Sequence, residues 1–577
     1  MYGAFVWARW ALNHPFRRFP ARAAFQSEWT EVHFIQPSNE AFPVVSTVGI
    51  VAAPSTEHAK TFAVADYMAA FGIPSHGLNY TSGAPVNGTA AVLAALADAE
   101  KAGPRVDKIV LLPIGKLFID GGLAIPPRTT LRGTAQDKST LYFLEEDGTG
   151  TQLGGLGKAQ GGSPALDPAY IYGNHTSSWG IEDLSIYVTH FSNCVIWVAE
   201  SSGFKLRRTL IRQLPYFCTG YQNILAGGGG GSKGGQPPAI GKRDKATMAA
   251  LGGHASRITN WTVGANNIGA MIFLQGASNV EISDNDLTCT QWCLKSSTVP
   301  YFPLDSKNLP LSQATHGPKP HHISIVRNSV NNADVAFALG GTSQGIVEHN
   351  EITGSVLGGG AIYPSSTGKL WCSHNTASMH YSGNREAMTY DGNGGGAYFG
   401  PVASAEAGST EVSLPAGAGG GGEVLMVING TGFGQIHAVV SYDRETCTYT
   451  LDEPLVAALG KDAWVQTLAY QGKSHYIGNR WSDTGGFQLY GSAFDHVVAE
   501  NVMRRMGGSM AWGQYFLNKT AVPPTVLQTS PDMRQLWLGD EVLDENGVRN
   551  YMASASHTPQ KARITNSTEV KPAQQDP

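Results

Sequence analysis

The segment VEISDNDL at residues 280–287 is the clearest copy of a repeat, and its pattern returns as ISIVRNSV at residues 323–330. Each segment has two apolar residues at alternate positions, an asparagine three residues after the second of them, and then one more apolar residue. Alternating apolar residues are typical of a short β-strand, and an asparagine after a strand can hydrogen-bond the backbone of a turn. The pattern therefore predicts a repeated strand and turn.

Weaker copies of this pattern extend the repeat in both directions. Their asparagines are Asn260, Asn350, Asn375, Asn479 and Asn501. Most of the intervals between neighbouring copies are 22–25 residues, a period typical of solenoid proteins. We interpret the interval of 43 residues between Asn285 and Asn328 as two coils, one of which has no recognisable asparagine.

Two kinds of solenoid have such a period. Leucine-rich repeats also carry an asparagine after a strand, but they need a leucine about eight residues before it. Here Ala277, Pro320 and Thr342 occupy that position. We therefore predict an all-β fold, a right-handed parallel β-helix in which successive buried asparagine amides form a ladder.

The composition excludes several classes of protein. Of the 577 residues 70 are glycine and only 15% are charged, which suits many turns and disfavours a helix bundle. The net charge of −5, with no block of Lys or Arg, gives no source of affinity for nucleic acid. No apolar run reaches the 18 residues that a membrane span requires. We expect neither nucleic acid nor a membrane as a partner.

The chain divides into three predicted regions. Residues 1–60 are predicted to form a small β-rich segment, residues 61–520 the β-helix, and residues 521–577 an irregular, partly disordered extension. A short helix over AAVLAALADAEK (90–101), with its N-cap at Asn87 or Thr89, is predicted to cap the β-helix. Residues 405–470 read as antiparallel strands with Gly-rich turns, and we predict a small β-insertion there beside the substrate groove.

Four stretches of the chain resemble the pectate-lyase-like superfamily of single-stranded right-handed β-helix proteins. They are LLPIGKLFIDGGLAIPPRTTLRG (111–133), SWGIEDLSIYVTH (178–190), SIVRNSV with GIVEHNEITG (324–354) and HYIGNRWSDTGGFQLYGSAFDHVVAENV (475–502). The resemblance covers about residues 65–520, although Asp66-Tyr67 and Pro85–Asn87 replace the usual Asp-Phe-Gly-Ala and Asp-Asp-Thr signatures. It implies a polysaccharide lyase, a glycoside hydrolase or a related glycan-binding protein.

The densest polar cluster lies between residues 374 and 396. Glycoside hydrolysis needs two carboxyl groups that flank the bond, and we predict Glu386 and Asp391 as this pair, or one of them with Asp483 from the following coil. His380, Arg385 and Tyr390 are predicted to bind the sugar. The segment resembles an N-R-E-x-x-T-[YF]-D-G segment of bacterial β-helix proteins associated with polysaccharide degradation. The purely structural alternatives are an ion pair between Glu386 and Arg385 and an Asx turn at Asp391.

A second cluster follows one coil later. Gln488 and Tyr490 share a strand face by the period of two and are predicted to contact substrate. Asp483 precedes Gly485-Gly486, so a turn is the alternative to a catalytic role. His322, after Pro320 at a strand start, is predicted as a further substrate contact, with a surface histidine pair as the alternative.

The predicted function is a glycoside hydrolase that cleaves an acidic or complex polysaccharide or oligosaccharide. A lyase that acts by β-elimination on a uronate glycan and a non-catalytic glycan-binding β-helix remain alternatives. Calcium needs converging carboxylates, but Asp284 and Asp286 lie two residues apart around Asn285 with no convincing third ligand. We expect no metal and no cofactor.

The six cysteines are scattered, and we expect buried free thiols, with one or two disulfides as the alternative. The opening MYGAFVWARWALNHPFRRF is a poor signal peptide. Seven N-x-S/T sequons are nevertheless compatible with an extracellular or secretory protein, which is the expected location.

Overall fold

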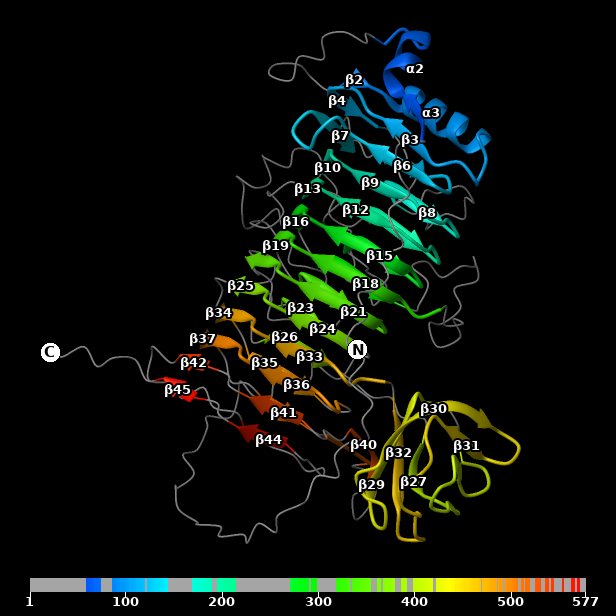
Figure 1. Ribbon diagram of the computed structural model, residues 1–577, viewed down its shortest axis with the longest axis vertical. Coiled ribbons are helices and arrows are strands. Elements are labelled where there is room, and N and C mark those ends of the chain that lie inside the picture. The colour runs from blue at the N-terminus through cyan, green and yellow to red at the C-terminus, as the bar shows by residue number, and fades with distance from the viewer. Residues whose placement is uncertain are drawn as a thin grey trace, which may run out of the picture.

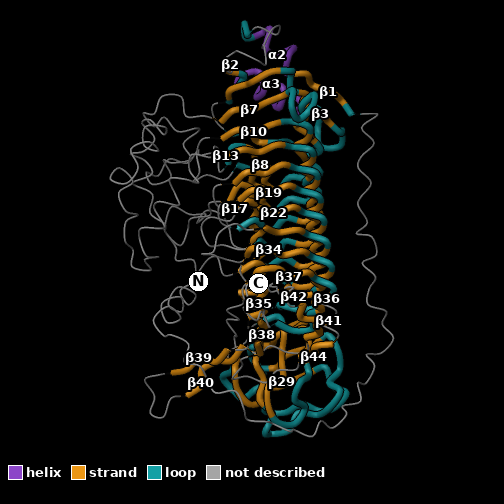
Figure 2. The backbone as a smooth tube through the Cα atoms, turned by 90° about the vertical axis from the view of Figure 1, so that its left-hand side faces the viewer, coloured by secondary structure: helices purple, strands orange, loops and turns teal. Residues whose placement is uncertain are grey.

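The computed structural model describes residues 59–143, 169–213, 270–297, 318–378, 386–391, 398–518 and 525–570, with gaps inside these ranges of which 74–85 is the longest. The described chain forms a right-handed parallel β-helix, an elongated stack of coils with helices at one end and an antiparallel insertion near the other (Figures 1 and 2). The predicted fold class is confirmed. None of the described helices is long and apolar enough to span a membrane.

Each described coil contributes one strand to each of two parallel sheets, A and B, and every described coil except the first and the last adds a strand to a third parallel sheet, C. Sheet A has thirteen strands, and its neighbours are hydrogen-bonded in chain order. Its strands are β1 (Lys60–Ala63), β3 (Lys108–Leu111), β6 (Thr129–Arg132), β9 (Gly180–Glu182), β12 (Lys205–Arg207), β15 (Ser278–Ser283), β18 (His321–Val326), β21 (Ser343–Glu348), β24 (Gly368–Ser373), β33 (His475–Ile477), β36 (Val497–Ala499), β41 (Gln535–Leu538) and β44 (Ala562–Thr565).

Sheet B follows sheet A in every coil after a short turn and also has thirteen strands. They are β2 (Val86–Asn87), β4 (Gly115–Phe118), β7 (Ser139–Phe143), β10 (Ser185–Val188), β13 (Leu210–Gln213), β16 (Asp286–Cys289), β19 (Ser329–Asn332), β22 (Glu351–Thr353), β25 (Thr376–Ser378), β34 (Arg480–Thr484), β37 (Val502–Met506), β42 (Glu541–Leu543) and β45 (Thr568–Val570).

Sheet C closes the coil and has eleven strands. They are β5 (Leu123–Ala124), β8 (Ile171–Asn174), β11 (Ile196–Ala199), β14 (Ala270–Gln275), β17 (Trp292–Ser297), β20 (Phe337–Leu339), β23 (Ile362–Tyr363), β26 (Glu386–Asp391), β35 (Gly486–Tyr490), β38 (Met510–Trp512) and β43 (Ala553–Ser554). Apolar side chains from all three sheets fill the interior, for example Ile282, Leu287 and Leu294 from one coil, each 0% exposed.

The predicted asparagine ladder is present at the turn between sheets A and B. The residue before the asparagine has a positive φ in each of four coils, at Asp284 (59°), Arg327 (55°), His349 (54°) and His374 (54°). This left-handed conformation is unfavourable for side-chain-bearing residues. The buried amide that follows stabilises the turn by hydrogen bonds along the stack. The ladder comprises Asn285, Asn328, Asn350, Asn375, Asn479 and Asn501.

The interval of 43 residues is a single coil, and the interpretation as two coils is wrong. The side-chain amide of Asn285 donates directly to Oδ1 of Asn328 at 2.8 Å, and β15 pairs with β18. The additional residues lie between β17 and β18, where 298–317 are outside the described residues. Asn260 also lies outside them.

Two helices, α2 (Val64–Ala70) and α3 (Thr89–Lys101), cover the N-terminal end of the coils. Ala91, Val92, Ala95, Leu96 and Ala99 of α3 are buried in the common core. The helix begins at Thr89 after Gly88, and Oδ1 of Asn87 accepts a hydrogen bond from the Thr89 N–H at 3.1 Å. The capping helix is therefore confirmed, with Thr89 as its first residue and not its N-cap.

The antiparallel insertion is also confirmed and begins slightly earlier than predicted. It connects β26 of sheet C with β33 of sheet A and forms a six-stranded sheet with its own apolar core. Its strands are β27 (Tyr398–Pro401), β28 (Glu411–Ser413), β29 (Val424–Asn429), β30 (Ile436–Asp443), β31 (Thr448–Leu451) and β32 (Trp464–Leu468). Figure 1 shows it beside the lower coils.

The parallel stack continues past residue 520, where the sequence predicts an irregular extension. Strands β41 and β44 extend sheet A, and β42 and β45 extend sheet B. A hairpin of β39 (Gln514–Asn518) and β40 (Thr525–Ser530) leaves the stack after β38 and contacts β27 and β32 of the insertion. The predicted β-rich segment at residues 1–60 lies outside the described residues, except for Ala59 and Lys60.

Candidate functional site

The two polar clusters found in the sequence come together on sheet C. Strand β26 contains Glu386, Tyr390 and Asp391, and β35 contains Gln488 and Tyr490. These strands are separated by more than 90 residues of sequence, yet they pair in parallel as neighbours because the insertion leaves the coil between them. The candidate site is therefore a surface of two adjacent coils.

The register of this pair is specific. Thr389 lies beside Gln488, and Asp391 lies beside Tyr490. The register shifts between Glu386 and Met388, so β26 has one extra residue there. A β-bulge of this kind bends a strand locally and changes the direction of its side chains, and such bulges are frequent beside active sites.

Successive side chains of β35 point alternately to the core and to the outer face of sheet C. Phe487 and Leu489 are both 0% exposed and pack in the interior of the coils. Gln488 between them therefore faces the outer side of sheet C, where it is 6% exposed. A covered polar side chain on this surface is suited to hold a hydroxyl group by directed hydrogen bonds.

Several predicted site residues are described by their backbone alone. This holds for Glu386, Tyr390, Asp391, Tyr490 and Asp483, whereas His380 and Arg385 lie outside the described residues. The roles predicted for these side chains stay predictions.

Asp483 lies within β34 of sheet B and not in a turn, which was the alternative to its predicted catalytic role. Strand β34 ends at Thr484 and β35 starts at Gly486, so the chain turns sharply from sheet B to sheet C. Since β26 pairs with β35 through Glu386 and Gly486, Asp483 is on the coil directly after the one that carries Glu386.

His322 is on a different sheet. It lies in β18 of sheet A with a positive φ of 53°, and its Nδ1 is 2.7 Å from Nδ1 of His321. At least one of the two rings must be neutral to accept this hydrogen bond. Burial, together with the neighbouring His322, lowers the pKa of His321. The structure does not bring His322 to the strands that carry Glu386 and Gln488.

The sequence reasoning missed Lys295 on the same sheet. Lys295 is half-buried on β17, three coils before β26, and burial lowers its pKa to about 8. Its neighbours in register are Phe273 and Ala338 on the adjacent strands. A single Lys in WCLKSS gives no signal in the sequence, because its burial depends on the coils around it.

Aromatic residues occupy the outer face of sheet C on the N-terminal side of Lys295. Tyr172, Trp197 and Phe273 hold equivalent register positions in successive coils. Trp197 is 8% exposed and Phe273 is 1% exposed, and the indole N–H of Trp197 donates to Oε1 of Gln275 at 3.2 Å. Trp197 and Phe273 are therefore shielded from solvent on this part of the face.

Among the residues that the structure describes, no three His, Cys, Asp or Glu side chains converge in a way that could hold a metal ion.

Comparisons with known proteins concern the fold. No protein-family profile matches the chain, and no curated protein matches it. The A-module of the mannuronan C-5 epimerase AlgE6 of Azotobacter vinelandii is 9% identical, with 89% of this chain and 100% of that chain covered and a TM-score of 0.41. The surface adhesin PfbA of Streptococcus pneumoniae is 10% identical over 90% of this chain and 96% of that chain, with a TM-score of 0.39.

A third similar structure is a mutant tailspike protein of E. coli bacteriophage HK620 in complex with a pentasaccharide. It is 6% identical, with 88% of this chain and 66% of that chain covered and a TM-score of 0.44. The strand order of sheets A, B and C gives the chain its parallel β-helix fold. These likenesses support no statement about its activity, because one fold can host several chemistries.

Proposed function

We propose that the protein is a glycoside hydrolase that cleaves an acidic or complex polysaccharide on the outer face of sheet C. The observation that carries the proposal is the parallel pairing of β26 with β35. It joins a strand that contains two carboxylates to a strand that contains Gln488 and Tyr490. Stacked coils offer a long regular surface, which suits an extended sugar chain.

By Cα separation, Glu386 and Asp483 match the acid and base better than Glu386 and Asp391 do. Five strand steps separate Glu386 from Asp391, so their Cα atoms are about 15 Å apart. Glu386 pairs with Gly486, three residues after Asp483. The step from one coil to the next is perpendicular to the direction of the chain. Together with the three residues from Gly486 back to Asp483, it places the Cα atoms of Glu386 and Asp483 at most about 12 Å apart. Catalytic carboxyl groups of glycosidases are about 5–9.5 Å apart.

Asp391 then has a binding role. It lies beside Tyr490, at the end of the strand pair from which the insertion departs. A carboxylate next to a tyrosine can accept hydrogen bonds from sugar hydroxyls while the ring packs against the apolar face of a sugar. His380, Arg385 and Gln488 complete the proposed sugar contacts, whereas Tyr390 pairs in register with the interior residue Leu489.

The decisive experiment screens the purified protein against soluble polysaccharides and analyses the products. New reducing ends without absorbance from an unsaturated uronate indicate hydrolysis. Binding without any product would indicate a non-catalytic glycan-binding protein and would contradict the proposal.

Lys295 favours a second candidate activity, β-elimination on a uronate glycan. A general base works best when its pKa is near the working pH, and burial lowers the pKa of Lys295 to about 8. An unsaturated product that disappears in Lys295→Arg, which cannot lose its proton at neutral pH, would support this activity. Hydrolysis that is unaffected by the same substitution would oppose it.

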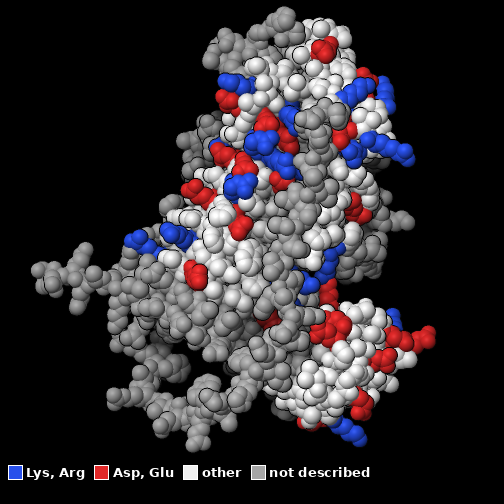
Figure 3. All heavy atoms as spheres, viewed as in Figure 1, with Lys and Arg blue, Asp and Glu red and all other residues white. Residues whose placement is uncertain are grey.

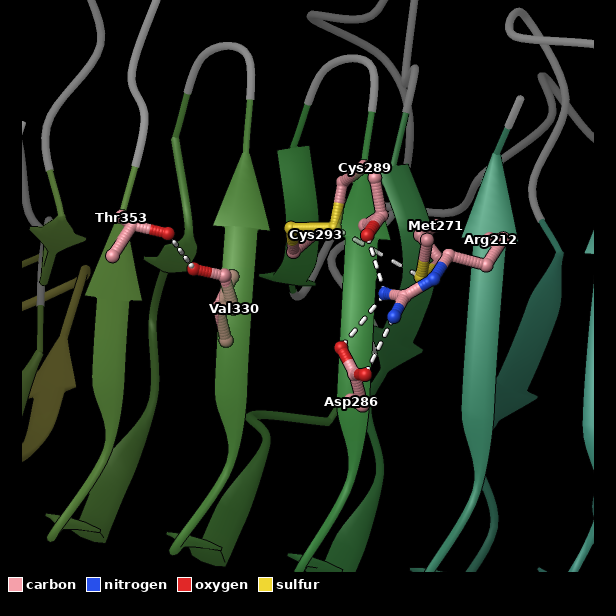
Figure 4. Close-up of a disulfide and its surroundings, with 8 residues drawn as sticks. Arg212, Met271, Asp286, Cys289, Cys293, Val330 and Thr353 are labelled. Carbon is pink, nitrogen blue, oxygen red and sulfur yellow. Dashed lines mark hydrogen bonds and ion pairs between the residues drawn. A yellow bond between two sulfur atoms is a disulfide. The ribbon is translucent and has the colours of Figure 1, made fainter. Parts of the chain in front are cut away.

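We also propose an extracellular or secretory location. The support is the disulfide between Cys289 and Cys293, which is the alternative that the sequence left open (Figure 4). Disulfides persist mainly in oxidising compartments. Cys372 and Cys447 are buried free thiols. Detection of the protein in culture medium with the disulfide intact would test the location.

A further inference from the structure

The insertion carries a pair of aromatic rings, one exposed and one half-buried, on the side that it turns toward the β-helix. Trp464 is 38% exposed, and its ring lies 5.2 Å from the half-buried ring of Phe399, at an angle of 57°. Phe399 packs against the apolar cluster of Val424, Met426, Ile428 and Leu468, which also contains Phe494 of the β-helix. The pair is therefore anchored to both bodies at one end and open to solvent at the other.

Two hydrogen bonds of Tyr398 hold the backbone that carries this aromatic pair. The hydroxyl of Tyr398 donates to the carbonyl of Pro401 at 2.6 Å, and the Tyr398 N–H donates to Oγ1 of Thr467 at 2.9 Å. Any side chain at Gly400 would meet the Tyr398 hydroxyl at 2.6 Å. The tyrosine thus lies across Gly400 on the opposite face of β27 and holds this edge strand in place, so that Phe399 supports Trp464 from a fixed position.

The pair also follows the candidate site closely in the sequence. Strand β27 begins at Tyr398, seven residues after Asp391, so the two strands are joined by a link that spans at most about 24 Å. Asp391 is at the end of β26 from which the insertion departs. The start of β27 therefore lies within reach of an extended sugar chain that is bound at the end of β26.

The charge of the insertion limits what it can bind. Between residues 398 and 468 there are eight acidic residues and two basic ones, a net charge of −6. Figure 3 shows acidic side chains on the visible face of this body. Such a surface repels polyanions within a Debye length of about 8 Å in physiological salt. A uronate-rich chain is disfavoured here, whereas an uncharged sugar ring is not.

We propose that Trp464 and Phe399 form an accessory subsite that binds an uncharged sugar unit of the substrate by stacking. This inference rests on the proposed glycan-directed function and narrows its substrate to a complex polysaccharide with neutral units. Trp464 presents a flat apolar face to the C–H groups of the sugar, and Phe399 fixes the orientation of the indole.

Affinity electrophoresis in gels that contain a neutral β-glucan, a galactomannan or polygalacturonate tests the proposal. Trp464→Leu keeps an apolar side chain without a flat ring, and Trp464→Phe keeps a ring. We expect Trp464→Leu to weaken binding to a neutral polymer about 5- to 30-fold, the usual effect of removing an aromatic contact. Trp464→Phe should retain most of the binding, and Val440→Ala, at an exposed apolar position of the same insertion (66% exposed), should bind like the unaltered protein.

Equal retardation of Trp464→Leu and the unaltered protein, with the same unfolding midpoint, would overturn the subsite. A larger effect of Trp464→Leu on polygalacturonate than on the neutral polymers would overturn the choice of an uncharged ligand. The Glu386→Gln protein separates this inference from the proposed function. It should lose turnover and keep binding through Trp464, so that a failed hydrolysis assay and a failed binding assay are distinguishable.

Discussion

Asn285 and Asn328 are 43 residues apart in the sequence, yet the amide of Asn285 donates to Oδ1 of Asn328 at 2.8 Å. The same oxygen accepts the backbone N–H of Asn285 at 3.1 Å, and the amide of Asn328 donates to the carbonyl of Ile282 at 2.9 Å. Both side chains are almost completely buried, at 2% and 1% exposed. The ladder therefore ties neighbouring coils together regardless of how long the intervening loop is.

Replacement of Asn328 by Leu should lower the free energy of unfolding by about 1–3 kcal/mol, because buried backbone groups in two coils lose their partners. Urea denaturation followed by circular dichroism measures this change. The matched control is Asn331→Leu, three residues later at an exposed position of β19, which should change stability by less than about 0.5 kcal/mol. Equal midpoints for both variants would mean that the ladder does not stabilise the fold.

If Glu386 and Asp483 are the acid and base, substitutions of Glu386, Asp483 and Asp391 should have different effects on kcat and KM. Glu386→Gln and Asp483→Asn should each lower kcat by about 10²–10⁴-fold on the true substrate with little change in binding, because each removes a titrating group and keeps its size. Asp391→Asn should raise KM more than it lowers kcat. If Asp391→Asn abolishes turnover and Asp483→Asn does not, then Asp391 is the partner of Glu386.

The charged face of sheets A and B contains ion pairs of unequal burial (Figure 3). Nε of Arg207 donates to Glu281 at 2.7 Å, with side chains 19% and 22% exposed, whereas the Arg327 and Asp284 side chains, also 2.7 Å apart, are 56% and 39% exposed. Arg207→Met should cost about 1–3 kcal/mol, because Glu281 is left half-buried without its partner. Arg327→Met should cost less than about 1 kcal/mol.

Double-mutant cycles with Glu281→Gln and Asp284→Asn isolate each pair energy. Burial raises the pKa of Glu281, but Arg207 brings it below its ordinary value, and the hydrogen bond from Arg327 lowers the pKa of Asp284. The stability that both pairs provide is present above the ordinary carboxyl pKa and is lost as the pH falls below it. Equal coupling energies for the two ion pairs would contradict the expectation that the more buried pair contributes more stability.

Acid should destabilise the fold through His496. This ring is completely buried beside Tyr476, and burial lowers its pKa to about 3 from the ordinary 6.5. The unfolded chain therefore binds a proton that the folded chain does not between these values. The resulting loss of stability is at most about 1.4 kcal/mol per pH unit as the pH falls below 6.5.

In His496→Gln this acid-dependent slope should become smaller, whereas His349→Gln at an exposed turn should leave it unchanged. Unfolding free energies measured at several pH values between 4 and 8 give both slopes. An unchanged slope in His496→Gln would mean that other groups control the acid sensitivity.

The Cys289–Cys293 disulfide closes a very short loop between β16 and β17. Chain-entropy arguments give about 2 kcal/mol for a loop of five residues. The Cys289→Ser, Cys293→Ser double variant should therefore unfold at lower urea concentration, and dithiothreitol should shift the unaltered protein toward the variant. If mass spectrometry of the unreduced protein finds both thiols free, the disulfide is absent and this prediction is wrong.

The class of fold could be predicted from the amino-acid sequence, because the repeat is a local pattern. Strand, asparagine turn and strand lie within eight residues, so VEISDNDL and ISIVRNSV already specify the turn that a stack of coils must satisfy. The capping helix and the insertion were predictable for the same reason, since helix and hairpin signals are also local.

Which coils are neighbours, and which residues pair across them, follows from the three-dimensional arrangement of the coils. The loops between coils of a solenoid can vary in length, because the ladder hydrogen bonds join asparagines that are 22 or 104 residues apart in the sequence. No local pattern could therefore count 43 residues as one coil, bring Glu386 beside Gly486, or detect Lys295. Register and burial follow from contacts between coils, and these contacts exist only when the coils are stacked.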